Sequence, residues 1–225
     1  MTESSRFELF AFWRTSATYR VRVGLNLKGL QAQERQVNLE AGEQRSADYL
    51  KINPMAAIPA LIDHAPGAPA GALTQSLAIL EFLEETQAEP ALLPADAQGR
   101  ARVRSLCLML AADTHPLITP RVKKYLVGKA QFDDAAWRAW QIHGFSTGLR
   151  ALEQRLVNEP GTGVFCHADA PTLADSCLAS IVVVMRVFKI EVAGIPMVLR
   201  IMAACEQLDA FALSAPALQF GAPPA

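Results

Sequence analysis

The chain has 225 residues, of which 51% are hydrophobic, and a formal net charge of -1 at pH 7. A nearly neutral chain with both signs interspersed has no general attraction to nucleic acid or to anionic membranes, so a small molecule is the expected partner. The first residues lack the pattern of a secretory signal, and no apolar run is long enough to span a bilayer. We therefore expect a cytoplasmic protein.

The four cysteines are widely spaced and form no C-x-x-C pair: Cys107, Cys166, Cys177 and Cys205. This spacing favours free thiols in a reducing compartment over a disulfide framework. His167 follows Cys166 directly, but a zinc site would need two further ligands at workable spacing. We predict no metal site and cysteines that behave as small buried hydrophobic residues.

The first part of the chain alternates strand-like and helical patterns. The apolar run FELFAFW predicts a buried strand that ends at Trp13, and helical periodicity follows over 16–29. An extended run near QERQVNL and a helical stretch over 44–52 come next, followed by IPALID and GALT, which can pair as a hairpin. A helix over 76–85 completes the order β-α-β-α-β-β-α. This order predicts a small mixed α/β sheet covered by helices.

A proline-containing segment without periodicity, 88–98, predicts a linker between a first domain (1–87) and a second domain (99–225). The pattern beyond it indicates an all-helical domain. The expected helices cover 98–126, 133–157, 172–187 and 195–208. The residues after Ala215, rich in Pro, Gly and Ala, are expected to lie loosely on the surface.

Hydroxyl residues gather where the first strand gives way to the first helix. Thr15, Ser16 and Thr18 lie at this point in the segment WRTSATYRVR. The unpaired N–H groups of a helix N-terminus and a hydroxyl donor both stabilise a thiolate, and so lower the pKa of a thiol held there. Ordinary N-capping by Thr15 or Ser16 is the alternative interpretation, and for such residues alone it is the more common one.

Two later segments offer peptide-binding geometry. In NPMAAIPAL, a cis bond between Ile58 and Pro59 would let the N–H and C=O of Ile58 pair with an extended peptide, although a proline that opens a strand is ordinary. In LTQSLAILEFLEE, Ser76 at a helix start can hold a carboxylate, and Gln75 can bind an amide or ammonium group. A serine N-cap is the alternative there.

One later pair of residues has a structural interpretation. The spacing of Thr172 and Asp175 is that of a capping box, in which each side chain satisfies a backbone N–H of the other residue. We predict that this pair starts a helix and takes no part in catalysis.

In this order, the three binding segments resemble the glutathione-binding domain of the glutathione transferases, and the zeta class fits best. The class motif S-S-C-x-x-R-V-R is similar to TSATYRVR here, and LNLKGL, VNLEAGEQRSADYLKINP and LTQSLAILEFLEE follow it. RARVRSLCLMLAADTHPL and APTLADSCL resemble the helical domain of the family. The resemblance implies a glutathione transferase fold, with a thioredoxin-like N-terminal domain, an all-α second domain and a homodimer.

The resemblance also implies an activity. Members of the class use glutathione, without consuming it, to isomerise maleylacetoacetate or maleylpyruvate in the catabolism of aromatic compounds or amino acids. Thiolate addition to the cis double bond leaves a single bond that rotates, and loss of the thiol gives the trans product. The implied roles are thiol activation by Thr15 or Ser16, glutathione binding by Ile58, Pro59, Gln75 and Ser76, and substrate binding by Arg14, His115 and Arg121.

The sequence departs from the class pattern at three places. Ala17 replaces the cysteine of the motif, the residues at 118–120 replace asparagines, and Val187 replaces a late arginine. We expect Pro120 to kink its helix. Arg186 lies one residue before the family's arginine, which turns its side chain by about 100° around the helix.

Two other functions stay open. A transferase or dehalogenase that conjugates glutathione to another electrophile would line its pocket with apolar side chains such as Met109, Leu110 and Val122, whereas a dicarboxylate isomerase needs at least two aimed cations. A non-enzymatic binding module of the same fold would not need this set of hydroxyl and amide residues together.

Overall fold

The computed structural model describes residues 5–224, which divide into two compact units: 5–91 together with 209–224, and 92–208. This division differs from the expected one at the C-terminus. The residues from Asp209 onward pack with the first unit, although they follow the helical part of the chain.

Within the described residues, the first unit has a four-stranded sheet in the order β2-β1-β3-β4. β1 (Phe7–Ala11) is parallel to β2 (Ala32–Gln36), and α1 (Ser16–Leu27) makes the crossover between them. β3 (Ala60–Asp63) is antiparallel to β1 and pairs with β4 (Leu73–Thr74), as the hairpin prediction required. The first strand ends at Ala11, two residues earlier than expected.

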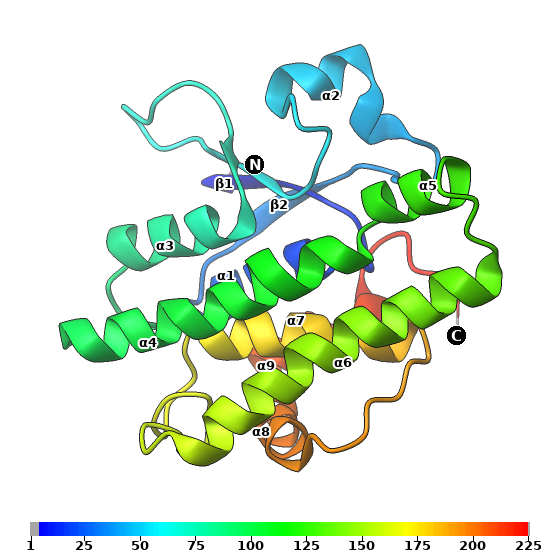
Figure 1. Cartoon of the computed structure of the whole chain (residues 1–225). Helices are drawn as coiled ribbons and strands as arrows, with labels where there is room; N and C mark the ends of the chain where they lie inside the picture. The colour runs from blue at the N-terminus through cyan, green and yellow to red at the C-terminus, as the bar shows by residue number, and fades with distance from the viewer. Residues whose placement is uncertain (1–4, 225) are drawn as a thin grey trace. The chain divides into compact units, whose positions relative to one another are not determined.

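Helices cover both faces of this sheet. α1 packs against α3 (Ser76–Thr86) on one face, and α2 (Ala47–Ile52), preceded by a 3₁₀ turn (Glu43–Arg45), lies on the other (Figure 1). The predicted order β-α-β-α-β-β-α is therefore the observed one.

Buried side chains alternate along β1, and their packing holds in place the two helices that carry the candidate hydroxyls. Leu9 on β1, Val21 on α1 and Ile79 on α3 belong to one apolar cluster and are completely buried. Side chains one turn apart share a face of a helix, and side chains two residues apart share a face of a strand. A few buried residues of this kind therefore hold each helix in one orientation on the sheet. Each contributes about 1.5–3 kcal/mol by leaving water. The first residues of α1 and α3, Ser16 and Ser76, are positioned by this packing.

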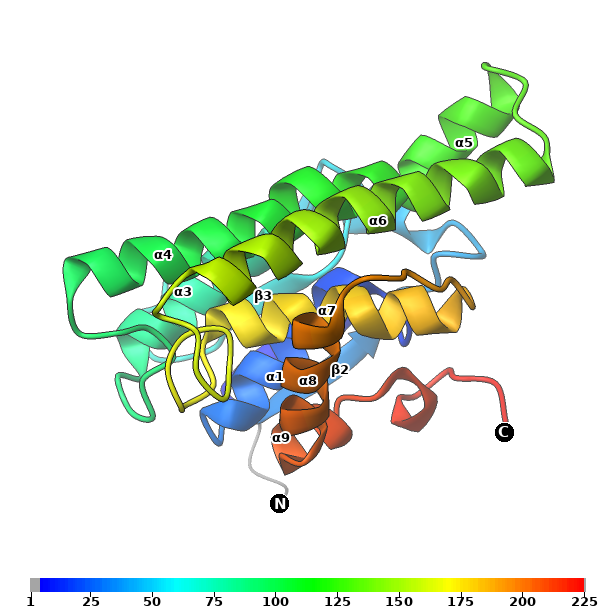
Figure 2. The same cartoon turned by 60° about the horizontal axis from the view of Figure 1, so that its bottom comes forward.

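The second unit is helical, as predicted. Its helices are α4 (Ala97–Leu108), α5 (Pro120–Gly128), α6 (Asp134–Asn158), α7 (Leu173–Val187) and α8 (Pro196–Glu206). α7, buried along most of its length, packs against α4 and α8, and α8 packs against α6 (Figure 2). No helix among residues 5–224 is long and apolar enough to cross a membrane.

The continuous helix expected over 98–126 is wrong. α4 passes into a π-helical turn (Met109–Thr114) and then a 3₁₀ turn (His115–Ile118), and α5 starts afresh at Pro120. Pro116 and Pro120 lack the N–H that a continuous helix needs, and their rings clash with the preceding turn. A proline fits well at the first position of a new helix, which is where Pro120 lies.

The predicted capping box at the start of α7 is confirmed. The N–H and hydroxyl of Thr172 both donate to one carboxylate oxygen of Asp175 at 2.8 Å, and the N–H of Cys166 donates to the other at 2.8 Å. Asp175 is completely buried, and loss of water raises the pKa of its carboxyl. Burial also raises the pKa of the Cys166 and Cys205 thiols, and all four cysteines are buried free thiols.

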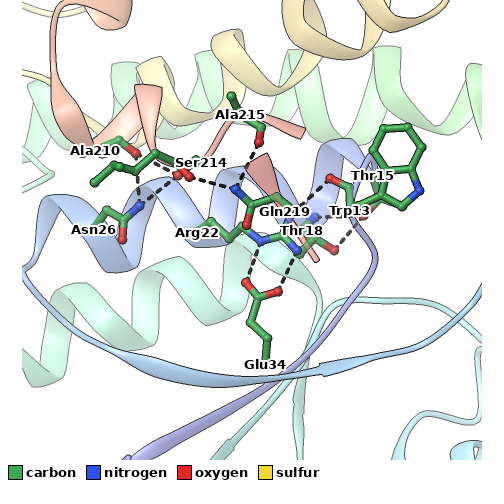
Figure 3. A network of polar contacts seen from close by, with 11 residues as sticks. Trp13, Thr15, Thr18, Arg22, Asn26, Glu34, Ala210, Ser214, Ala215 and Gln219 are labelled. Carbon is green, nitrogen blue, oxygen red and sulfur yellow. Dashed lines mark hydrogen bonds and ion pairs between the residues drawn. The ribbon is translucent and has the colours of Figure 1, made fainter. Parts of the chain in front are cut away.

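The expected loose tail after Ala215 is largely exposed, but the segment before it and several of its own side chains anchor it. α9 (Asp209–Ala212) packs on α1, and the amide of Asn26 donates to the Ser214 hydroxyl at 3.0 Å. The side chain of Gln219 binds two backbone carbonyls of the same segment, and Pro216 is buried (Figure 3). Local side-chain hydrogen bonds therefore fix a stretch that has little helical propensity.

Candidate functional site

Thr15 is the N-cap of α1. Its Oγ1 accepts the N–H of Thr18 at 3.4 Å and lies 2.6 Å from the Thr18 hydroxyl, to which it donates. The capping interpretation is therefore correct for this hydroxyl. It does not exclude the functional one, because the cap keeps the hydroxyls of Thr15 and Ser16 beside the positive end of the helix.

A buried guanidinium joins the starts of two helices. Arg20 is 1% exposed, and its Nη2 donates to Ser16 Oγ at 3.0 Å while its Nη1 donates to Ser76 Oγ at 3.2 Å. Ser16 is the first residue of α1 and Ser76 the first residue of α3. The structure thus brings together two hydroxyls that lie 60 positions apart in the chain.

Sequence reasoning matched Arg20 to an arginine of the class motif but gave it no role. The signal that could have found it is its spacing, because residues four apart lie on the same face of a helix and Arg20 follows Ser16 by four. An arginine on the inner face of an amphipathic helix needs polar partners, and serines at helix starts supply them.

Gln75 has a strained backbone at the N-cap of α3, with φ 68° and ψ 113°. A positive φ is unfavourable for a residue with a Cβ, and such strain persists where surrounding structure imposes it, often at binding sites. Its side chain is exposed and makes no capping hydrogen bond. The amide is therefore presented outward, beside the N–H groups of the first turn of α3.

The loop before β3 is anchored to α2. Tyr49 Oη and Asn53 Nδ2 each donate to the carbonyl of Ala57 at 2.7 Å. The Ile58–Pro59 bond that follows is cis. The N–H and C=O of Ile58 have no hydrogen-bond partner among residues 5–224, so this segment offers a backbone donor and acceptor to an extended peptide.

Arg14 is already paired. Its Nη2 lies 2.6 Å from Glu40 Oε1, and its guanidinium stacks 5.4 Å from the centre of the Trp13 ring. Both partners of the ion pair are partly exposed. Arg14 can meet a substrate carboxylate only by leaving or sharing Glu40.

Arg22 holds the turn that carries Thr15 in place (Figure 3). Arg22 makes a two-pronged ion pair with Glu34, at 2.6 and 2.8 Å, and donates from Nη1 to the carbonyl of Trp13 at 3.3 Å. Two-pronged arginine–carboxylate pairs are geometrically specific. The backbone just before Thr15 is thereby held in one position.

Gln44 is a second residue to which sequence reasoning gave no role. It lies in the 3₁₀ turn before α2, is 6% exposed, and its amide oxygen has no hydrogen-bond partner among the described residues. A buried acceptor without a donor costs about 1–3 kcal/mol, so a ligand donor at this place would be favoured. It lies within VNLEAGEQRSADYLKINP, which resembles the class, but no periodicity in the sequence distinguishes it from its neighbours.

The other predicted substrate residues lie in the second unit. His115 begins the 3₁₀ turn and is partly buried. Arg121, in the first turn of α5, is exposed and has no ion pair or hydrogen bond among residues 5–224. A cation is disfavoured at a helix N-terminus, so no local interaction accounts for it. Arg186 forms an ion pair with Glu206. No three His, Cys, Asp or Glu residues in the described part of the chain are grouped as a metal site requires.

Comparison with known proteins agrees with this fold. The model of the glutathione S-transferase N-terminal domain matches residues 5–85. The chain is 39% identical to maleylpyruvate isomerase of Ralstonia sp over 94% of its length and 98% of the relative, and 40% identical to maleylacetoacetate isomerase of Rhizobium meliloti over 90% and 92%.

Solved structures give the same result. Maleylacetoacetate isomerase from Methylobacterium extorquens AM1, solved with bound malonate and glutathione, superposes with a TM-score of 0.92 at 44% identity, covering 96% of this chain and all of that one. A holo maleylpyruvate isomerase, described as a bacterial zeta-class glutathione S-transferase, gives 0.90 at 38% identity with the same coverage. A thioredoxin-like unit and a helical unit of this kind define a glutathione transferase. Within that superfamily, the chain belongs to the zeta-class family of maleylacetoacetate and maleylpyruvate isomerases.

Proposed function

We propose that this protein is a cis-trans isomerase that uses glutathione to convert maleylacetoacetate or maleylpyruvate to its trans isomer during the catabolism of aromatic compounds or amino acids. The observation that carries the proposal is the pair of hydroxyls, Ser16 and Ser76, held at two helix N-termini by the same buried Arg20. Two relatives with these isomerase names match the chain over nearly their whole length, which supports the proposal.

The first unit fits an extended, anionic tripeptide. In the proposal, the thiolate of glutathione lies at the start of α1. Ser16 donates to it, or Thr15 does so by turning its hydroxyl away from Thr18, and the helix N-terminus stabilises the charge. Ile58, followed by Pro59, pairs with the cysteinyl backbone. Ser76 and the strained Gln75 hold the γ-glutamyl end at the start of α3, where the helix dipole again favours a carboxylate.

Gln44 extends this set. Its buried amide oxygen has no partner among the described residues and would accept an N–H of the ligand. That interaction would offset the cost of leaving a buried acceptor unsatisfied.

The chemistry needs few protein groups. When bound, glutathione supplies a thiolate that adds to the cis double bond and leaves again after rotation. Thr15 or Ser16 would stabilise the thiolate by hydrogen-bond donation, both before it adds to the double bond and when it leaves. The enolate charge that builds on the neighbouring carbonyl would need preorganised hydrogen-bond donors to stabilise it. No proton or electron is gained or lost over the cycle, because the product is an isomer of the substrate.

Three residues are proposed to bind the substrate carboxylates: Arg14, His115 and Arg121. Arg121 is the strongest candidate, because it is exposed and without an ion pair in the described part of the chain. Arg14 contributes only when it exchanges Glu40 for the substrate. Guanidinium groups suit this task, since they bind carboxylates with two parallel hydrogen bonds.

A conjugating transferase is the second candidate function. The observation in its favour is that Arg14 is neutralised by Glu40 and Arg186 by Glu206, which leaves fewer open cations for a dicarboxylate. Such an enzyme would join glutathione permanently to its electrophile.

We further infer a cytoplasmic homodimer. Four buried free thiols suit a reducing compartment. Large apolar side chains such as Met55 and Tyr125, which are 55% and 66% exposed, are available for contact with a second copy. Sedimentation equilibrium tests the dimer, because a single species of monomer mass would exclude it.

The isomerase proposal is tested by following the absorbance of maleylacetoacetate and of maleylpyruvate with and without glutathione. A glutathione-dependent loss of one of these absorbances, with formation of the fumaryl isomer, supports the proposal. Glutathione binding without turnover of either acid would favour the conjugating transferase instead.

A further inference from the structure

We propose that Arg20 is a positioning residue that strengthens the Ser16 and Ser76 hydroxyls as donors to the two ends of glutathione at once. The inference rests on the proposed function and assigns a role to a residue that touches neither end of the ligand itself. It is based on one buried guanidinium that donates hydrogen bonds to two serines on two helices.

The geometry requires a forked side chain. Nη2 of Arg20 reaches back one turn along α1 to Ser16, and Nη1 reaches across to Ser76 on α3, over 3.0 and 3.2 Å. The two helices pack against each other on one face of the sheet. A guanidinium is planar and presents its donors in a fixed fork, so one side chain can fix the separation of two acceptors.

The electrostatic effect has the same sign at both serines. Each oxygen accepts a hydrogen bond from a permanent cation, and a hydroxyl polarised in this way becomes a better donor through its own hydrogen. The effect is stronger at a buried site because water screens it less. Both serines also lie at helix N-termini, where the helix dipole adds positive potential. The arrangement therefore favours two anions: a thiolate near Ser16 and a carboxylate near Ser76.

This role predicts two effects from one substitution. Arg20→Met should raise the pKa of the bound glutathione thiol by about one unit, which is a tenfold change in thiolate stability. It should also weaken binding of glutathione about tenfold, and weaken cysteinylglycine, which lacks the γ-glutamyl group, much less. Arg20→Lys keeps the charge but has a single nitrogen and cannot donate to both serines from separate atoms. It should therefore keep either the native thiol pKa or the native affinity for glutathione, and not both.

The experiment titrates the thiolate absorbance of bound glutathione against pH and measures both dissociation constants by calorimetry. Lys28→Met is the matched control. The side chain of Lys28 is also completely buried in the first unit, but it pairs with Glu84 and touches neither serine. Its loss should lower stability and leave the thiol pKa and both dissociation constants unchanged. All measurements are made on variants shown to be folded by circular dichroism.

Double variants separate positioning from general damage. If Arg20 acts through Ser16, the thiol pKa of Ser16→Ala should rise little further when Arg20→Met is added. If it acts through Ser76, the same should hold for glutathione affinity in Ser76→Ala. Additive effects in both pairs, or unchanged pKa and affinity in folded Arg20→Met or Arg20→Lys, would overturn the inference. Native protein that binds no glutathione would instead contradict the proposed function.

Discussion

Tyr49 and Asn53 donate to the same acceptor, the carbonyl oxygen of Ala57, each over 2.7 Å. Burial raises the pKa of the Tyr49 phenol to about 12, so the group stays protonated and remains a donor throughout the physiological range. Asn53 also accepts the N–H of Met55 at 3.1 Å. Tyr49 on α2 and Asn53 at the C-terminal end of α2 therefore set the path of the loop that leads to Ile58.

This arrangement predicts graded effects on glutathione binding. Tyr49→Phe removes one of the two donors to Ala57 and should cost about 1 kcal/mol of stability, with a small rise in KM for glutathione. Asn53→Ala removes a donor and an acceptor, so we expect about 2 kcal/mol and a rise in KM of roughly tenfold. The kcat values at saturating glutathione should change little. A fall in kcat with unchanged KM in Asn53→Ala would contradict the positioning role.

Substitutions of the two hydroxyls at the start of α1 should affect stability and kcat differently. Thr15→Ala removes both the cap and a donor, so it should lower the free energy of unfolding by about 1 kcal/mol and also reduce kcat. Ser16→Ala leaves the cap intact, and should reduce kcat about tenfold or more by raising the pKa of the bound thiol. Thr15→Ser is the matched control and should retain most of both. Full activity in Thr15→Ala and Ser16→Ala together would show that neither hydroxyl acts on the sulfur.

The ion pair between Arg14 and Glu40 should compete with the substrate. Glu40→Gln frees the guanidinium, so we expect KM for the dicarboxylate to fall several-fold, while Arg14→Met should raise it by a similar or larger factor. The KM for glutathione serves as the internal control. If Arg14→Met leaves KM for the dicarboxylate unchanged, Arg14 is a surface residue only, as such pairs often are.

Acid should weaken the second unit through Glu159. Its carboxylate lies 2.5 Å from Arg155 and 2.6 Å from Arg102, and these hydrogen bonds, with that of Arg155 the larger effect, lower the pKa of Glu159 below its ordinary 4.5. A depressed carboxyl pKa gives stability that is present above the unfolded value and is lost as the pH falls through the folded value.

Glu159→Gln should therefore be less stable than the native protein at pH 7 and lose less stability below pH 4.5. Urea titrations at a series of pH values measure this difference. The matched control is Asp48→Asn, which breaks the largely exposed pair with Lys51 and should leave the unfolding profile almost unchanged. Parallel acid profiles for native protein and Glu159→Gln would contradict the assignment.

The sequence predicted the order of elements in the first unit because the signals are local. An apolar run marked β1, and Pro and Gly marked the hairpin turn. In the second unit, the spacing of Thr172 and Asp175 likewise marked the capping box. The long helix over 98–126 failed because helical periodicity persisted through Pro116 and Pro120, where the chain changes helix type without losing its apolar spacing.

The candidate site was only partly predictable for a related reason. Thr15, Ser16 and Ser76 were found because helix starts have a sequence signature. Arg20 and Gln44 were not, because what distinguishes them is burial and the identity of their partners. The pairing of Arg14 with Glu40, and of the C-terminal segment with α1, likewise depends on tertiary contacts that local patterns do not encode.

The central claim is that glutathione acts as a catalyst and is returned at each turnover. The most direct measurement is the number of free thiols left after a known amount of maleylacetoacetate or maleylpyruvate has reacted in the presence of substoichiometric glutathione. We predict that many equivalents of one of these acids become the trans isomer while the thiol concentration stays constant. A loss of one thiol for each molecule of acid consumed would contradict the claim and identify the protein as a conjugating transferase.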